Sequence, residues 1–118
     1  MGNSVPHYCL KEVKKLVQAE SIEFDRNAEK TFDDLCDATG FGTKNLIEAI
    51  QSIKLDDFHK SISYTRFVAD VYKTTYYFKT INEWDEPEVD PIDLYVKLAV
   101  REVQGIKKIV LLTSFKQL

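Results

Sequence analysis

The apolar residues of this 118-residue chain change their spacing near its middle. In the first half they recur three or four residues apart, which is typical of an amphipathic helix. In the second half they alternate with polar residues along segments rich in Val, Tyr, Phe and Thr, which is typical of strands. The clearest examples are Leu10, Val13, Leu16 and Val17 for the helical spacing and Leu94, Val96, Leu98 and Val100 for the alternation. Helices followed by an antiparallel meander predict an α+β fold, in a single domain over residues 1–118.

The first half predicts three helices and one short extended piece. The extended piece spans residues 21–24, after the first helix. A second apolar stripe runs from Ala28 to Thr39, and Gly40 stands where a left-handed residue would end that helix. Thr43 is a suitable N-cap for the third helix. The predicted inner face of the third helix is Leu46, Ile47, Ile50 and Ile53.

The second half predicts strands over residues 59–80 and 94–100, a reversal at residues 104–105, and a last strand over 109–115 that is apolar enough to be central. The segment 83–93 interrupts them, because it holds two prolines, six carboxylates and no basic residue. We predict that it is a long exposed loop.

The charges are unevenly distributed along the chain. The net charge is −3, which argues against a nucleic-acid partner, yet without residues 83–93 the chain has 16 basic and 13 acidic residues. Residues 59–82 and 94–118 together carry 9 basic and 2 acidic side chains. The predicted strands therefore form the basic part of the protein, and the total charge does not exclude RNA.

Several classes of protein are disfavoured by the sequence. The longest apolar run, Ile109 to Leu112, is far shorter than the roughly 18 residues of a membrane helix. No signal peptide is visible, so we expect a soluble cytoplasmic protein without a membrane partner. Cys9 and Cys36 read as inert thiols, and the two histidines lack metal-ligand spacing. No metal and no cofactor are expected.

Three groups of residues, near the start, middle and end of the chain, carry a family resemblance. They are Pro6-His7 with Leu10 and Val13-Lys14-Lys15-Leu16-Val17, then Asp57-Phe58-His59-Lys60-Ser61 with Asp70-Val71-Tyr72-Lys73, and finally Tyr95-Val96-Lys97 with Thr113-Ser114-Phe115-Lys116. In this order they resemble the motility quorum-sensing regulator (MqsR) toxins, which are part of the RelE-like group of mRNA interferases. The resemblance covers nearly the whole chain apart from the insert at 83–93.

The resemblance implies both a fold and a function. The fold would be N-terminal helices packed on a twisted antiparallel sheet of the RelE-like type. The function would be that of a type II toxin, a metal-independent endoribonuclease that binds and cleaves mRNA on the ribosome and so inhibits translation. A cognate antitoxin, usually encoded beside the toxin, would restrain this hydrolase.

The resemblance also assigns residues to the site. RNA supplies its own nucleophile, the 2′-hydroxyl, so the enzyme must move protons and stabilise charge on the phosphate. Lys60 and Lys116 match lysines that would stabilise that charge, and Tyr95 matches a tyrosine suited to hydrogen bonding or proton transfer. His59 stands where the family has tyrosine, and as an acid or base it is the fourth catalytic candidate. The candidates for RNA binding are Lys73, Tyr72, Lys97 and Arg101.

Two differences from the family bear on the function: Ala69 replaces a glutamine of the family's site and cannot hydrogen-bond through its side chain, and His59, in place of the tyrosine, is a candidate to compensate. Lys73 also stands where the family tends to have arginine, and it loses the bidentate fork. The alternatives are a catalytically eroded RNA- or protein-binding module and an unrelated α+β interaction domain whose resemblance in the strands is coincidental. The lysines and tyrosines could also be a solvated surface of the sheet.

Two further features are open at this stage. One is the role of the aromatic residues in the first predicted strands, which either stack on RNA bases or pack in the core. These residues are Tyr72, Tyr76, Tyr77 and Phe78. The segment 83–93 is either a solvated loop or a set of carboxylates that folds over the basic face and competes with RNA, or that binds a basic antitoxin with Trp84 as anchor.

Overall fold

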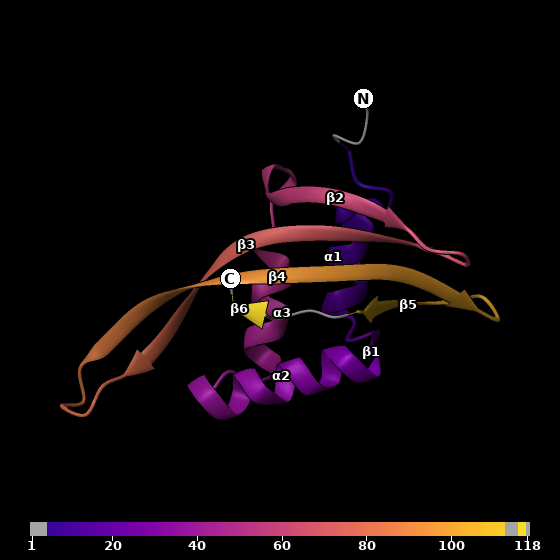
Figure 1. The fold of residues 1–118 in the computed structure, drawn as a ribbon. Coiled ribbons are helices and arrows are strands. Elements are labelled where there is room, and N and C mark those ends of the chain that lie inside the picture. The colour runs from indigo at the N-terminus through magenta and orange to yellow at the C-terminus, as the bar shows by residue number, and fades with distance from the viewer. Residues whose placement is uncertain (1–4, 113–115, 118) are drawn as a thin grey trace.

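A computed structural model of the protein describes residues 5–112 and 116–117. In this part of the chain, three α-helices pack against one twisted, mostly antiparallel sheet, as Figure 1 shows. The predicted α+β class is confirmed. The elements are α1 (Leu10–Gln18), β1 (Ile22–Phe24), α2 (Arg26–Thr39), α3 (Thr43–Gln51), the 3-10 helix η1 (Leu55–Asp57), β2 (Phe58–Ser63), β3 (Val68–Ile81), β4 (Pro87–Val103), β5 (Ile106–Leu111) and β6 (Lys116–Gln117).

The strands follow the order β1-β5-β4-β3-β2 across the sheet, and β6 pairs with β4 beyond the end of β5. The meander from β2 to β5 is antiparallel, as predicted, with the reversal before β5 at Gln104 and Gly105, which both have positive φ. β5 lies between β1 and β4, so the predicted central place of the last strand is confirmed. Its bounds differ from the predicted 109–115, because β5 begins at Ile106 and ends at Leu111, and residues 113–115 lie outside the described structure. The extended piece predicted at residues 21–24 is β1, and the feature that was not predicted is its parallel pairing with β5.

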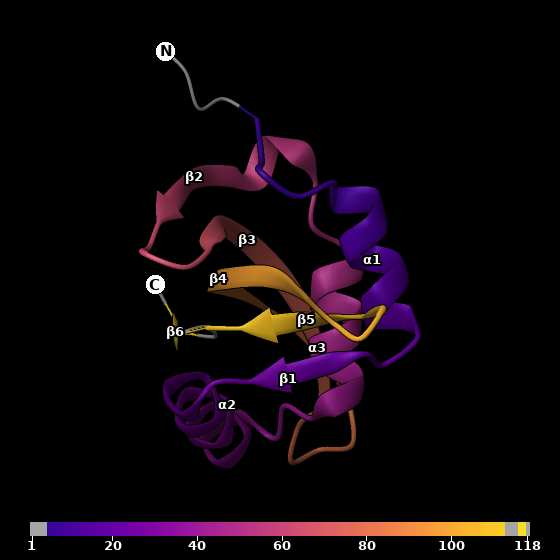
Figure 2. The same ribbon diagram turned by 90° about the vertical axis from the view of Figure 1, so that its right-hand side faces the viewer.

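Helices α1 and α3 cover one face of the sheet, and α2 lies beside β1 at its lower edge, as Figure 2 shows. The core forms between α1, α3 and the inward-facing residues of the strands, such as Tyr72, Leu94 and Val96, which are fully buried. No helix of the described ranges is long and apolar enough to span a membrane.

The helix ends follow the predicted chemistry with one exception. Gly40 ends α2 in the left-handed conformation, with φ of 81°. The predicted N-cap of α3 is wrong by one residue, because Gly42 occupies that position and Thr43 is the first helical residue. The Asn45 side chain accepts a hydrogen bond of 2.9 Å from the Gly42 N–H, so a side chain inside the first turn satisfies the N–H of the cap residue.

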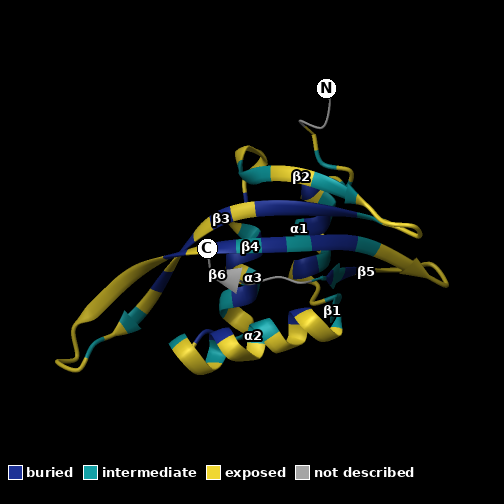
Figure 3. Ribbon diagram, viewed as in Figure 1, coloured by how far each residue is buried: buried dark blue, intermediate teal, exposed yellow. Residues whose placement is uncertain are grey.

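Only residues 83–86 of the predicted loop at 83–93 lie in a connection, because residues 87–93 are part of β4. β3 and β4 stay paired beyond the rest of the sheet, from Thr75 opposite Asp93 to Ile81 opposite Pro87. Figures 1 and 3 show this hairpin, which we call the β3–β4 arm (residues 75–93), projecting from the molecule with a largely exposed surface. Only residues 82–86 connect its strands, and the Asn82 side chain accepts the N–H groups of Trp84 (2.9 Å) and Glu86 (3.0 Å). Residues 87–93 form a strand because they pair with residues of β3 that favour strands. The composition of 83–93 alone gives no sign of this pairing.

Candidate active site on the open face of the sheet

The face of the sheet opposite α1 and α3, which we call the open face, carries most of the candidate residues. In β4 the side chains alternate, so that Val96 is fully buried toward the helices while Tyr95 and Lys97 lie partly exposed on the open face. In the register with β3, Tyr95 stands opposite Lys73, and Lys97 stands opposite Val71. The predicted RNA-binding lysines thus lie beside the predicted catalytic tyrosine.

A β-bulge brings two more candidates to this face. Phe58 stands opposite Tyr72 and packs on its ring with centroids 5.7 Å apart, on the helix-covered side. The next pair is Lys60 opposite Val71, so His59 is the extra residue of β2. His59 points away from the side of Phe58, and the register shift puts Lys60 on the same side as His59. Both side chains are exposed on the open face.

The position of the last predicted catalytic residue, Lys116, is known from its backbone pairing alone. β6 pairs with β4 so that Lys116 stands opposite Tyr95, which makes Lys73, Tyr95 and Lys116 one row across three strands. The Lys116 side chain lies outside the described structure. With strands about 4.8 Å apart and about 3.3 Å per residue, the Cα atoms of Lys60 and Tyr95 are about 12 Å apart, within reach of one bound phosphodiester for side chains of this length.

Lys97 is engaged by the connection between β2 and β3. Its Nζ donates a hydrogen bond of 3.0 Å to the Tyr64 hydroxyl and lies 5.7 Å from the centre of the Tyr64 ring. The Tyr64 ring stacks on that of Phe67, with centroids 4.8 Å apart. The β2–β3 connection is therefore folded against the open face and borders the candidate site.

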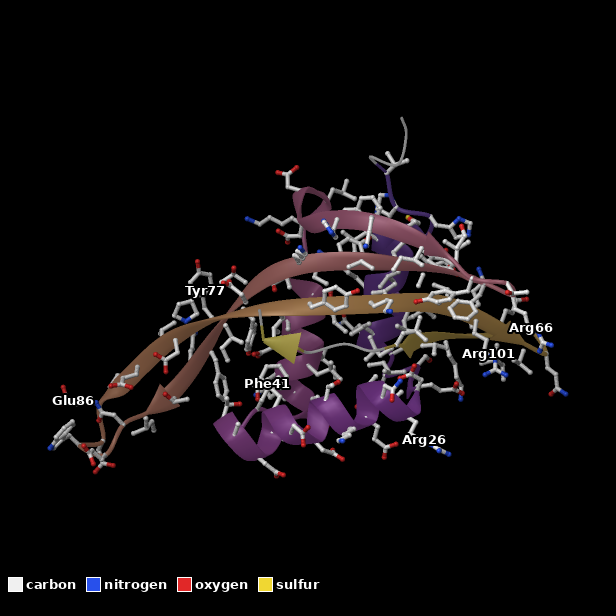
Figure 4. The ribbon with its side chains drawn as sticks, in the orientation of Figure 1. Arg26, Phe41, Arg66, Tyr77, Glu86 and Arg101 are labelled. Atoms are coloured by element: carbon white, nitrogen blue, oxygen red, sulfur yellow. The ribbon has the colours of Figure 1, made fainter. Side chains whose placement is uncertain are left out.

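A cavity of about 400 Å³ lies beside this connection and is lined in part by Arg66, Phe67, Ala99 and Arg101. Figure 4 shows Arg66 and Arg101 at the same end of the sheet. Arg101 also pairs with Glu23 at 3.8 Å, an exposed contact that contributes little stability. The sequence reasoning missed Arg66, Tyr64 and Phe67, although two aromatic residues around an arginine between two strands would have been a signal for them.

Tyr72, predicted to bind RNA, is in the core instead. Its side chain is fully buried on the helix-covered side, and its hydroxyl has no hydrogen-bond partner among the described residues. Burial raises the pKa of this hydroxyl well above its ordinary value, so it stays protonated. Tyr76 and Phe78 are likewise buried, and both pack on Phe41. Of the four aromatic residues considered for stacking, only Tyr77 is exposed.

The raised pKa values of three tyrosines predict how the stability of the fold depends on pH. Burial raises the pKa values of Tyr8, Tyr72 and Tyr76 above about 10, so the folded protein keeps these protons where the unfolded chain releases them. Their contribution to the free energy of unfolding is therefore completely present below about pH 10 and is lost as the pH rises above that value. Tyr72→Phe removes an unpaired buried hydroxyl and is expected to add about 1 kcal/mol at neutral pH. It should also reduce the alkaline loss and leave RNA affinity unchanged, which urea unfolding and RNA titration measure.

The carboxylates of the arm do not fold over the open face, contrary to one hypothesis from the sequence. In the register, Asp90 stands opposite Phe78 and Glu88 opposite Thr80, on the side opposite Tyr77 and Tyr95. Asp93 does share the open face, where it accepts a hydrogen bond of 2.7 Å from the Thr75 hydroxyl. Figure 1 shows the arm extending away from the helices and from the rest of the sheet. Competition between these carboxylates and RNA has no support in this arrangement.

The thiols and possible metal ligands are scattered. Within residues 5–112 and 116–117, no three His, Cys, Asp or Glu side chains come together as a metal site. Cys9 and Cys36 are free, and burial raises the pKa of the Cys36 thiol, which makes it less reactive. The candidate groups for chemistry on the open face are the ammonium groups, the imidazole of His59 and the phenol of Tyr95.

Comparison with protein families finds one match that spans this whole arrangement. The model of the family described as "Motility quorum-sensing regulator, toxin of MqsA" matches residues 5–117. The chain belongs to this family. It is therefore a toxin of a toxin–antitoxin system, and its protein partner is an antitoxin. A search of individually curated proteins gives no match. The predicted MqsR resemblance is confirmed, and the β3–β4 arm lies within the matched range.

Proposed function

We propose that this MqsR-family toxin is an endoribonuclease that cleaves mRNA without a metal ion and thereby stops translation. One observation carries the proposal: the bulge in β2 sets His59 and Lys60 on the same exposed face as the cross-strand pair of Lys73 and Tyr95. This face combines cations, which attract a phosphodiester, with two groups that can exchange protons.

The proposed reaction uses the nucleophile of the RNA itself. The 2′-oxygen attacks the adjacent phosphorus as its proton passes to a base, and the bond from phosphorus to the 5′-oxygen breaks as that oxygen receives a proton. The products are a 2′,3′-cyclic phosphate and a 5′-hydroxyl. Lys60, Lys73 and Lys116 stabilise the charge on the phosphoryl oxygens, while Tyr95 and His59 hydrogen-bond and transfer protons.

The ribosome fits this site as the place of cleavage. The described part of the open face has no carboxylate–histidine pair, and a site of this kind gains from a substrate that is held in a reactive geometry. The mRNA on a ribosome is such a substrate. We therefore propose a ribosome-dependent activity in the cytoplasm, restrained by the antitoxin.

His59→Ala tests whether the histidine takes part in the reaction. We expect the rate of cleavage to fall about 100-fold, because general acid–base catalysis contributes at least that much. His7→Ala is the matched control, since His7 is also exposed but contacts the Tyr8 ring, 4.7 Å away, rather than the open face. A wild-type rate for His59→Ala removes this residue from the mechanism.

The second candidate function is an RNA- or protein-binding module that no longer cleaves. It is favoured by Ala69, which stands opposite Ile62, is fully buried, and has no side-chain group for the hydrogen bonds of the family glutamine. Induced expression of the wild-type chain separates the two functions. Growth arrest that a neighbouring gene product relieves supports the toxin nuclease, whereas harmless expression with salt-dependent RNA binding supports the module.

A further inference from the structure

The two outer edges of the β3–β4 arm have no neighbouring strand in the described structure. β2 pairs with β3 only between residues 68 and 72, and β6 pairs with β4 only at Leu94 and Tyr95. Residues 75–81 of β3 and 87–93 of β4 therefore pair with each other alone. Each outer edge presents unpaired backbone N–H and C=O groups, which form a template for another strand.

The chemistry of the two edges differs. The β4 edge is blocked by Pro87 and Pro91, which have no N–H, and by the carboxylates of Glu88, Asp90 and Asp93. The β3 edge has the sequence Thr-Tyr-Tyr-Phe-Lys-Thr-Ile, without proline or carboxylate and with one lysine. These residues favour strands strongly. Only the β3 edge is therefore open to an added strand.

A cavity of about 480 Å³ lies where this open edge begins. It is lined by Glu48, Lys54, Asp57 and residues 74–77 of β3, so successive residues of the strand, from both of its faces, border it. Glu48 accepts a hydrogen bond of 2.7 Å from the Tyr76 hydroxyl, and Asp57 accepts one of 3.3 Å from the Thr74 hydroxyl. The cavity can take a side chain of an added strand, and its two carboxylates, which outnumber the single lysine in the lining, favour a basic one.

The open face of the arm offers apolar contacts to the same strand. Tyr77 is 61% exposed and Ile81 is 72% exposed, and both lie on β3 on this face. Figure 4 shows Tyr77 on the arm, away from the core residue Phe41. A strand beside β3 would place alternate side chains next to Tyr77 and Ile81, while its backbone supplies the hydrogen bonds.

The net charge of the arm indicates which kind of partner can bind at the β3 edge. Residues 75–93 contain 1 basic and 6 acidic side chains, a net charge of −5. This charge repels RNA, and it also opposes the pairing of two copies of the arm. We infer that the β3 edge at residues 75–81 receives an extended, basic segment of the antitoxin as an additional strand. The inference rests on the toxin–antitoxin pairing and is independent of the ribonuclease proposal.

The first test compares two substitutions in the arm. The antitoxin encoded beside the toxin gene is titrated against wild-type, Tyr77→Lys and Val89→Lys toxin by calorimetry. A lysine at position 77 would stand directly beside the added basic strand and disfavour its pairing with β3. The Kd of the antitoxin for Tyr77→Lys toxin is therefore expected to rise about tenfold or more. Val89 is similarly exposed, at 54%, and shares the open face, but it lies on β4 behind β3, so its substitution is expected to change the Kd less than about threefold. Equal effects, or none, overturn the inference.

The second test reads the edge directly in the wild-type protein. Antitoxin binding is expected to slow amide hydrogen exchange in residues 75–81 and to leave residues 88–90 unchanged. Protection of both strands or of neither contradicts the added strand. Protection of residues 75–81 by RNA, or by raising the concentration of the free toxin, would instead identify RNA or a second copy as the occupant. Neither test measures cleavage, so their failure is distinct from failure of the nuclease proposal.

Discussion

Asp70→Ala is expected to lower the free energy of unfolding by about 3–5 kcal/mol, because it removes an acceptor that serves three donors at once. The Asp70 carboxylate is fully buried and accepts the backbone N–H groups of His7 (2.9 Å) and Tyr8 (2.8 Å). It also accepts the hydroxyl of Ser61 at 2.6 Å. The substitution leaves these three groups without their partner, in a partly buried place.

The consequence of losing Asp70 extends to the candidate site. Its contacts join the segment before α1 to β3, and they join β3 to β2 directly after the bulge that carries His59 and Lys60. Urea unfolding measures the loss, with Asp93→Ala as the control. Asp93 is exposed and, among the described residues, bonds the Thr75 hydroxyl alone, so its substitution should change stability by less than about 0.5 kcal/mol. A change below about 1 kcal/mol for Asp70→Ala would contradict its anchoring role.

Lys60→Ala is expected to reduce RNA cleavage about 100-fold or more, since removing one preorganised group that stabilises transition-state charge has an effect of this size. Lys60 is exposed and stands opposite Val71, so its truncation is expected to leave the unfolding free energy within about 0.5 kcal/mol of wild type. The loss of activity would then reflect chemistry rather than misfolding.

Two further variants control this result. Lys54→Ala removes an exposed lysine beside η1, on the cavity at the β3 edge rather than on the open face, and is expected to leave cleavage unchanged. Lys60→Arg retains the charge and is expected to recover part of the rate. Full activity of Lys60→Ala would remove this residue from the site.

Local sequence patterns predicted much of the fold. Apolar spacing predicted α1 to α3 and the last strands, and Gly40 predicted the end of α2, because these signals act within a few residues. The arm was missed because the prolines and carboxylates of 87–93 resemble a loop, whereas their strand state depends on pairing with residues 75–81. Pro87 and Pro91 are tolerated there because the outer edge of β4 needs no N–H.

The candidate site was also predictable only in part, because its geometry depends on pairing between strands that are distant in the sequence. The family resemblance predicted Lys60, Tyr95 and Lys116, but the bulge that turns both His59 and Lys60 to one face depends on the register between β2 and β3. The burial of Tyr72 did have a local signal. Lys73 and Lys79 occupy the positions that alternate with Tyr72, so the charged residues already marked the exposed side of β3.

The most direct test of the account is the chemistry of the RNA ends that the purified toxin produces. A defined mRNA is incubated with the toxin and ribosomes, in parallel with the same mRNA carrying a 2′-deoxy nucleotide at each mapped cleavage position. We expect fragments with 2′,3′-cyclic phosphate and 5′-hydroxyl ends from the first mRNA and no cleavage at the substituted positions of the second. Intact RNA under all these conditions, or cleavage that persists without the 2′-hydroxyl, would contradict a ribonuclease site on the open face.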